Sequence, residues 1–199
     1  MLLVWYGEAA PGKTSPAGRY LLARMYWQVT GLPLPSLRIE SGGRPVLSEG
    51  PGFSFSISHT GTRVFTALCT GPVGLDAERL ERRVRLELAP RILAPEELHA
   101  FRSAGSPPAL LLKYWTLKES WGKFTGEGIR GYPNNLSFRL ENGVPHLTGS
   151  AAYFQTAERL GCTLALCTLL PERPQFRQLS LPPALSHAAQ VLQYNEEQL

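Results

Sequence analysis

Apolar residues recur along the chain with two periods, every second residue in some segments and every third or fourth in others. The first period is typical of half-buried strands and the second of helices that bury one face, so the sequence predicts a mixed fold. The helical period is sustained longest over 107–124, which predicts a long helix. Further helices are expected over 16–30, capped by Ser15, over 86–93 and 95–103, and over 182–194 in the tail.

Strand patterns flank a glycine-containing turn at four places, and each place predicts a β-hairpin. These hairpins join 36–40 to 44–47, 53–59 to 63–70, 136–140 to 144–147, and 151–158 to 162–170. Single strands are expected over 2–6 and 73–78. The first residues lack a basic stretch and reach Glu8 early, so we interpret them as a strand rather than a signal peptide.

Two pairs of segments repeat in the same order, about 100 residues apart. Residues 37–45 (LRIESGGRP) match 138–145 (FRLENGVP), and residues 66–70 (TALCT) match 164–168 (LALCT). Hairpins draw on few residue types, so coincidence is the alternative, but the common offset favours a duplicated unit. We therefore expect an α+β fold built as a pseudo-twofold duplication, with halves over 1–100 and 101–199. Ligands often bind in the cleft between two such halves.

Composition excludes several classes of protein. With 43% hydrophobic and 18% charged residues among 199, the chain is not disordered, and no apolar run of the roughly 18 residues needed to cross a membrane occurs. The chain has an odd number of cysteines, and all of them lie in apolar stretches: Cys69, Cys162 and Cys167. This pattern predicts buried thiols in a reducing, cytoplasmic compartment. The net charge of +4 suits an anionic ligand without requiring nucleic acid.

The acidic residues are 15 Glu and a single Asp, Asp76, in the segment Gly74-Leu-Asp-Ala-Glu78. Side chains two apart on a strand share a face, so Asp76 and Glu78 point the same way. Paired carboxylates suit a Mg²⁺ ion whose remaining ligands come from phosphate. The alternative is a strand that runs into solvent with both acids hydrated.

The long predicted helix places Trp115, Glu119 and Lys123 on one face, because they lie four residues apart. Such a face can present a carboxylate and an amine to a metal and a phosphate, or it can hold an ordinary ion pair beside a core tryptophan. Upstream, the expected strand over 53–59 ends in Ser58 and His59, and a histidine at a strand end is more often structural. The sequence contains no hydrolase elbow, zinc-ligand spacing, P-loop or dinucleotide fingerprint.

Taken in order, three segments resemble the Sfp-type 4′-phosphopantetheinyl transferases: SISHT (56–60), VGLDAE (73–78) and WTLKES (115–120) followed by Lys123. The family pattern is I-S-H-S, then G-[IV]-D, then [FW]-[SCT]-x-K-E-[SA]-x-x-K. The resemblance extends over residues 15–170, where Gly43-Arg44-Pro45 is similar to the family's G-K-P turn. It implies a pseudo-twofold α+β fold and transfer of phosphopantetheine from coenzyme A to a carrier-protein serine, releasing adenosine 3′,5′-bisphosphate.

The resemblance also implies a role for each matching residue. Asp76, Glu78 and Glu119 would hold Mg²⁺, or Mn²⁺ in its place, on the coenzyme A pyrophosphate, and Glu119 would be the base, directly or through water. Lys123, also catalytic, and Lys118 would contact phosphates. The remaining coenzyme A contacts would be Ser58 and His59 at the 3′-phosphate, and Arg19, Arg44 and Pro45 elsewhere on the nucleotide.

The implied partner is an apo acyl or peptidyl carrier protein, with no nucleic acid or membrane, and a monomer is expected. The basic stretch of Arg79, Arg82, Arg83, Arg85 and Arg91 either steers an acidic carrier or belongs to a solvated helix paired with Glu81 and Glu87. Ala77 departs from the family's Ile or Val, and Gly122 lies mid-helix, where it admits a close backbone approach to a ligand or marks a kink.

Two other functions compete with this reading. A non-catalytic relative would bind coenzyme A or a carrier without transfer, but the intact Asp76, Glu78, Glu119 and Lys123 speak against it. A nucleic-acid-binding protein would need a basic stripe with interleaved aromatic residues. Trp115 and Trp121 beside Lys118 and Lys123 are the only candidates, and Glu119 lies among them.

Overall fold

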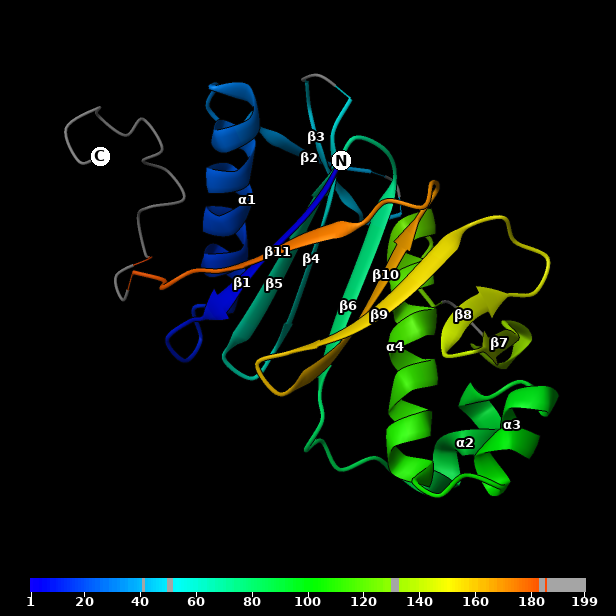
Figure 1. Cartoon of the computed structure of the whole chain (residues 1–199). Coiled ribbons are helices and arrows are strands. Elements are labelled where there is room, and N and C mark those ends of the chain that lie inside the picture. Colours follow the sequence, from blue (N-terminus) through cyan, green and yellow to red (C-terminus); the bar gives the residue numbers. More distant parts are fainter. Residues whose placement is uncertain (41, 50–51, 130–132, 183–184, 186–199) are drawn as a thin grey trace.

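The computed structural model describes residues 1–40, 42–49, 52–129, 133–182 and 185, and arranges them in four layers (Figure 1). Two β-sheets pack face to face, and one long helix covers the outer face of each sheet. The first sheet has the strand order β11-β1-β5-β4, and the second has the order β6-β10-β9. The described part of the chain is therefore a mixed α+β structure.

The first sheet is covered by helix α1 (Thr14–Thr30). Its strands are β1 (Leu2–Glu8), β4 (Ser54–Thr60), β5 (Arg63–Cys69) and β11 (Pro174–Gln178). A small hairpin of β2 (Leu37–Ile39) and β3 (Pro45–Leu47) lies between α1 and β4 in the chain.

The second sheet is covered by helix α4 (Pro107–Thr125). Its strands are β6 (Val73–Arg79), β9 (Tyr153–Arg159) and β10 (Cys162–Thr168). Short helices precede α4 at η1 (Leu86–Leu88), α2 (Ala89–Ile92) and α3 (Pro95–Arg102). After α4 come η2 (Pro133–Asn135) and a hairpin of β7 (Phe138–Glu141) and β8 (Val144–Leu147).

The two sheets arise from the same succession of elements. Each begins with a strand, continues through a long helix and a small hairpin, and ends in two antiparallel strands. The opening strand pairs antiparallel with the last strand in both cases, β1 with β5 and β6 with β10. The repeated sequence segments fall on matching elements, 37–45 and 138–145 on the small hairpins and 66–70 and 164–168 on β5 and β10.

Alternation along β1 shows how one strand serves two cores. Leu2, Val4 and Tyr6 face the core between the sheets, where they meet buried side chains of β5, β6 and β10. Leu3 and Trp5 face the opposite way, into the core beneath α1. A strand that is buried on both faces loses the regular apolar–polar alternation, as in the run Leu2–Tyr6 of β1 and in β10, where two buried threonines are the only polar residues.

Most predicted elements are confirmed, but three predictions need correction, one strand was missed and one prediction is untested. Helix α1 begins at Thr14 with Lys13 as its N-cap, so Ser15 is not the cap. The predicted helix over 86–93 is η1 followed by α2. The arginines from 79 to 85 lie at the end of β6 and in an irregular turn, not on a helix. Strand β11 was not predicted, and most of the expected tail helix over 182–194 lies outside the described residues.

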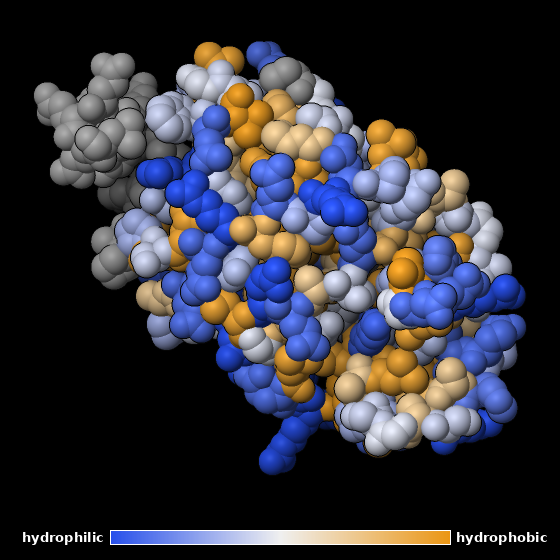
Figure 2. Space-filling model, viewed as in Figure 1, coloured by the Kyte–Doolittle hydropathy of each residue, from blue (hydrophilic) through white to orange (hydrophobic). Residues whose placement is uncertain are grey.

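The surface carries both polar and apolar side chains. On the face shown in Figure 2, apolar residues are interspersed among hydrophilic ones. Within the described ranges, none of the helices combines the length and the apolar character needed to cross a bilayer. Cys69, Cys162 and Cys167 are buried free thiols, as predicted.

Candidate active site

The candidate site lies where β6 packs against α4, and Gly74 permits their close approach. A Cβ atom at Gly74 would overlap the carbonyl oxygen of Ser120 and lie 2.6 Å from the amide nitrogen of Phe124. Any other residue here would push the helix away from the strand. Gly74 therefore brings the acidic end of β6 within reach of the polar face of α4.

Asp76 is the buried centre of the site. Only 6% of the Asp76 residue is exposed to solvent. Its Oδ1 atom accepts a hydrogen bond from the Lys123 ammonium at 2.8 Å and another from the Ser58 hydroxyl at 2.9 Å. Within the described residues, Oδ2 is buried without a hydrogen-bond partner. A buried, unpaired carboxylate oxygen is costly unless a ligand completes it.

Glu78 lies on the same side of β6 as Asp76, as the two-residue spacing predicts. Its carboxylate accepts a hydrogen bond from the Trp115 indole at 3.2 Å and pairs with the Arg82 guanidinium. Trp115 and Lys123 thus both reach carboxylates of β6 from α4. This confirms that they share a helix face.

Glu119 lies between Trp115 and Lys123 on α4. Burial raises the pKa of its carboxyl group, and the negative charge of Asp76 raises it further, while Lys123 opposes the shift. Helix geometry places Glu119 one turn before Lys123, which is hydrogen-bonded to Asp76. A carboxylate with a raised pKa is a stronger general base than an ordinary one.

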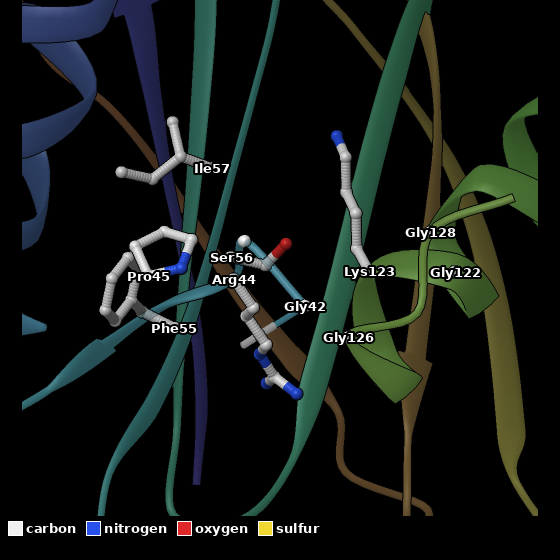
Figure 3. A pocket seen from close by; sticks show the side chains of 11 residues that line it. Gly42, Arg44, Pro45, Phe55, Ser56, Ile57, Gly122, Lys123, Gly126 and Gly128 are labelled. Carbon is white, nitrogen blue, oxygen red and sulfur yellow. The ribbon is translucent and has the colours of Figure 1, made fainter. Parts of the chain in front are cut away.

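Beside these residues is a cavity of about 270 Å³ (Figure 3). Lys123 enters it from α4, and Arg44 enters from the turn of the first small hairpin, where it donates a hydrogen bond to the Phe124 carbonyl at 2.9 Å. The cavity shares Pro45, Phe55 and Ile57 with a larger groove of about 800 Å³. The cavity and the larger groove therefore adjoin at these three residues.

Arg19 and His59 line the larger groove. Both side chains are exposed, and they come from α1 and the end of β4. Residues spread over more than 100 positions of sequence are therefore brought to two adjoining depressions: Arg19, Arg44, Pro45, His59 and Lys123. A basic lining of this kind suits an extended anionic ligand.

Lys118 does not reach this site, so the structure contradicts the prediction that Lys118 contacts a phosphate. Its side chain is fully buried, and its ammonium lies 2.5 Å from the Glu97 carboxylate, 2.7 Å from the Ile92 carbonyl oxygen and 3.1 Å from the Pro133 carbonyl oxygen. An ammonium has three protons, so these partners use all of them. Burial lowers the pKa of Lys118, while the negative charge of Glu97 opposes that change.

Glu97 is a structurally important residue that the sequence did not single out. Its carboxylate also accepts hydrogen bonds from the backbone amides of Ala94 at 2.8 Å and Phe138 at 2.7 Å. It therefore ties α3, α4 and β7 together. The available signal was weak, since an acid in the first turn of a helix is common.

Gly122 serves the chain's own backbone. A Cβ atom there would lie 2.7 Å from the carbonyl carbon of Gly128, and the amides of Gly126 and Gly128 both donate to the Gly122 carbonyl at 3.0 Å. The close approach expected at Gly122 is therefore made by the turn after α4. That turn forms part of the cavity wall.

The donor set fits Mg²⁺ in its chemistry. In the described ranges, no three histidine, cysteine or acidic side chains are gathered closely enough to hold a metal. Lys123 pairs with Asp76, and Arg82 pairs with Glu78. Mg²⁺ generally takes only one or two protein carboxylates and fills its shell with water and phosphate. Asp76, through its unpaired Oδ2, and a neighbouring glutamate would supply that number of carboxylates.

Comparison with known proteins gives concordant similarities. Residues 72–166 match the model of the 4′-phosphopantetheinyl transferase superfamily. The chain is 31% identical over 127 residues to the 4′-phosphopantetheinyl transferase psf-1 of Bacillus pumilus, covering 62% of this chain and 54% of psf-1. It is 28% identical over 141 residues to the transferase Sfp of Bacillus subtilis, covering 67% of this chain and 62% of Sfp.

Among solved structures, the holo-[acyl-carrier-protein] synthase of Neisseria meningitidis matches with a TM-score of 0.43 and 28% identity, over 48% of this chain and 94% of that chain. The alignments with psf-1 and Sfp span little more than half the length of those relatives. The matched segment contains Asp76, Glu78, Glu119 and Lys123. Over this segment, the chain is similar to the 4′-phosphopantetheinyl transferase superfamily.

Proposed function

We propose that this chain transfers the 4′-phosphopantetheine arm of coenzyme A to a serine of an apo carrier protein and releases adenosine 3′,5′-bisphosphate. The observation that carries the proposal is the cluster of Asp76, Glu119 and Lys123 where β6 meets α4. This cluster lies beside a basic cavity and within the segment that matches the family.

The reaction needs a base and a site that stabilises phosphate charge. The serine oxygen bonds to the β-phosphorus of coenzyme A, and the bond from that phosphorus to the bridging oxygen breaks, so that the leaving group carries the electron pair away. Glu119 takes the serine proton, directly or through a water. Its buried position beside Asp76 favours the protonated product of that step.

Cations of the chain bind and neutralise the phosphates. Lys123 lies between Asp76 and the cavity, so its ammonium is placed to contact the pyrophosphate. Arg44 and Pro45 border the same cavity, and Arg19 and His59 line the groove that would take the nucleotide, with His59 at the 3′-phosphate. Phosphoryl transfer depends mainly on such positioning and charge stabilisation.

Asp76, Glu78 and Glu119 would hold Mg²⁺, or Mn²⁺ in its place. When bound, the ion would neutralise charge on the pyrophosphate as the adenosine bisphosphate departs. The unpaired Oδ2 of Asp76 is the strongest support for this assignment, because a buried acceptor without a donor calls for a cation.

The repeated succession of elements supports a pseudo-twofold duplication. The sequence alone predicts halves over 1–100 and 101–199. The pairing of β6 with β10, together with the start of the family match at residue 72, favours including β6 in the second unit. With both units in one chain, a monomer is the expected form, and its buried free thiols fit a cytoplasmic protein.

The proposed partner is an acidic acyl or peptidyl carrier protein. After β6, the chain exposes Leu80, Leu86 and Leu88 among arginines. Arg82 pairs with Glu78, and Arg79 lies 3.9 Å from Glu81, so Arg83 and Arg85 are the more available cations. Apolar and basic side chains side by side would suit an amphipathic acidic helix.

The test is intact-mass spectrometry of a panel of apo carrier proteins incubated with coenzyme A, Mg²⁺ and this protein. The expected result is a gain of one phosphopantetheine arm that disappears with EDTA or with Asp76→Asn, which keeps the side-chain shape. Glu81→Gln is the matched control, because it removes an exposed carboxylate outside the cluster. Tight coenzyme A binding without transfer to any carrier would contradict the proposal and favour a non-catalytic relative.

A further inference from the structure

Two serine hydroxyls of β4 bridge to the backbone of β6, and this contact between the two sheets is called the seam here. Strands β4 and β6 belong to different sheets, yet Ser56 and Ser58 of β4 bond directly to β6. The Ser56 hydroxyl accepts from the Leu75 amide at 2.9 Å, and the Ser58 hydroxyl accepts from the Ala77 amide at 3.2 Å. The two serines are two residues apart and therefore act from the same face of β4.

The two hydroxyls differ in where they donate. Ser56 donates to the Leu75 carbonyl oxygen at 3.4 Å, whereas Ser58 donates to Oδ1 of Asp76 at 2.9 Å. A serine hydroxyl has one proton to donate, and Ser58 is only 5% exposed. Its proton is therefore committed to Asp76, which leaves no donor for a phosphate of the ligand.

His59 follows Ser58 but lies on the other side of the strand, because successive side chains alternate. It is exposed and lines the large groove, while Ser58 is absent from the lining of both depressions. The adjacent pair Ser58-His59 therefore divides between two tasks. Only the histidine faces the space in which a nucleotide would lie.

We infer that Ser58 is a positioning residue that holds the Asp76 carboxylate with Oδ1 engaged and Oδ2 available to a divalent cation, and that it makes no contact with the coenzyme A 3′-phosphate. The Lys123 ammonium supports the same orientation by sharing Oδ1 at 2.8 Å. With both donors on one oxygen, the unpaired oxygen is the one left for the ion. This inference rests on the proposed function for its substrate.

The kinetic test compares coenzyme A with 3′-dephospho-coenzyme A. Ser58→Ala should lower kcat by the same factor for both substrates, because it acts through Asp76. His59→Ala should raise KM for coenzyme A and leave KM for the dephospho substrate almost unchanged. If Ser58→Ala instead raises KM only for coenzyme A, Ser58 contacts the 3′-phosphate and the inference is wrong.

The second test measures Mn²⁺ binding by electron paramagnetic resonance, which needs no turnover. Loss of a side chain that orients a metal ligand typically weakens metal binding by about 10–100-fold, and we expect that range for Ser58→Ala. Ser56→Ala removes the equivalent seam hydroxyl without touching Asp76, so it should weaken Mn²⁺ binding far less. Ser58→Thr keeps the hydroxyl and should restore most of the affinity.

Thermal unfolding of the same variants separates folding from positioning. Ser56→Ala and Ser58→Ala each lose one seam hydroxyl, so similar losses of stability accompanied by different Mn²⁺ affinities support the inference. Equal Mn²⁺ affinities in the two variants would overturn it, as would unchanged affinity in Ser58→Ala. If wild-type protein binds Mn²⁺ but modifies no carrier, the proposed function fails while the Mn²⁺ comparison still decides the role of Ser58.

Discussion

Lys118 and Lys123 lie five residues apart on α4 and face opposite environments. The Lys118 side chain is 0% exposed and pairs with Glu97, which is equally buried. The Lys123 side chain is 30% exposed and pairs with Asp76 at the edge of a cavity. One lysine joins α4 to the small helices and β7, while the other faces the candidate site. The difference shows that a lysine's role within one motif depends on which side of the helix meets solvent.

The largest effect is expected from Lys118→Met. Removing one partner of a buried ion pair leaves the other charge uncompensated and typically costs about 3–5 kcal/mol of stability. The measurement is urea unfolding monitored by tryptophan fluorescence. The double variant Glu97→Gln with Lys118→Met should recover part of the loss, because it leaves no charge stranded. A single variant as stable as wild type would show that the pair does not hold α4 in place.

The matched change on the other face, Lys123→Met, should cost less stability than Lys118→Met, because the Lys123 side chain is 30% exposed and Asp76 keeps its hydrogen bond from Ser58. The transfer rate, in contrast, should fall by roughly 10²–10³-fold if Lys123 stabilises phosphate charge. Single-turnover carrier modification at saturating coenzyme A measures this loss. A variant that loses stability but keeps its rate would reverse the comparison between the two lysines.

Gly74→Ala tests whether the close packing of α4 on β6 is needed for both stability and transfer. The added methyl group would overlap the helix backbone at Ser120, so α4 must shift away from β6. Overpacking of this kind typically costs about 1–3 kcal/mol. The same shift should reduce transfer, because Lys123 and Glu119 would move away from Asp76. Gly71→Ala, where a Cβ meets nothing within 4 Å, is the control, and equal behaviour of the two variants would contradict the packing argument.

The sequence was most informative where local pattern and long-range packing agree. The shared face of Trp115, Glu119 and Lys123 follows from helix geometry alone, and the structure confirms it for Trp115 and Lys123 through their bonds to β6. The four predicted hairpins are confirmed, because alternation and a glycine turn are both local signals. The repeated segments on matching elements extended that local information to the whole fold.

What the sequence did not provide depends on contacts between distant segments. Lys118 and Lys123 differ only in which neighbours fold against them, and Glu97 is 21 residues from its lysine. Strand β11 was missed because Pro174–Gln178 has a single large apolar residue, Phe176, and becomes a strand by pairing in parallel with β1 at the sheet edge. Ser58 matched a motif, but its partner Asp76 became evident only from the seam between the sheets.

The smallest expected effect is that of Trp115→Phe, which sharpens the description of the site-facing side of α4. The indole donates to Glu78 at 3.2 Å, and Arg82 pairs with the same carboxylate. Because Arg82 remains, losing the indole donor should cost about 0.5–1.5 kcal/mol of stability, the usual contribution of one hydrogen bond. Thermal unfolding measures this cost, and Trp121→Phe serves as a comparison because Trp121 packs among Phe124 and Phe154 away from the carboxylates. If Trp115→Phe also lowers Mn²⁺ affinity while Trp121→Phe does not, Glu78 belongs to the cation site; equal affinities would leave Asp76 and Glu119 as its protein ligands.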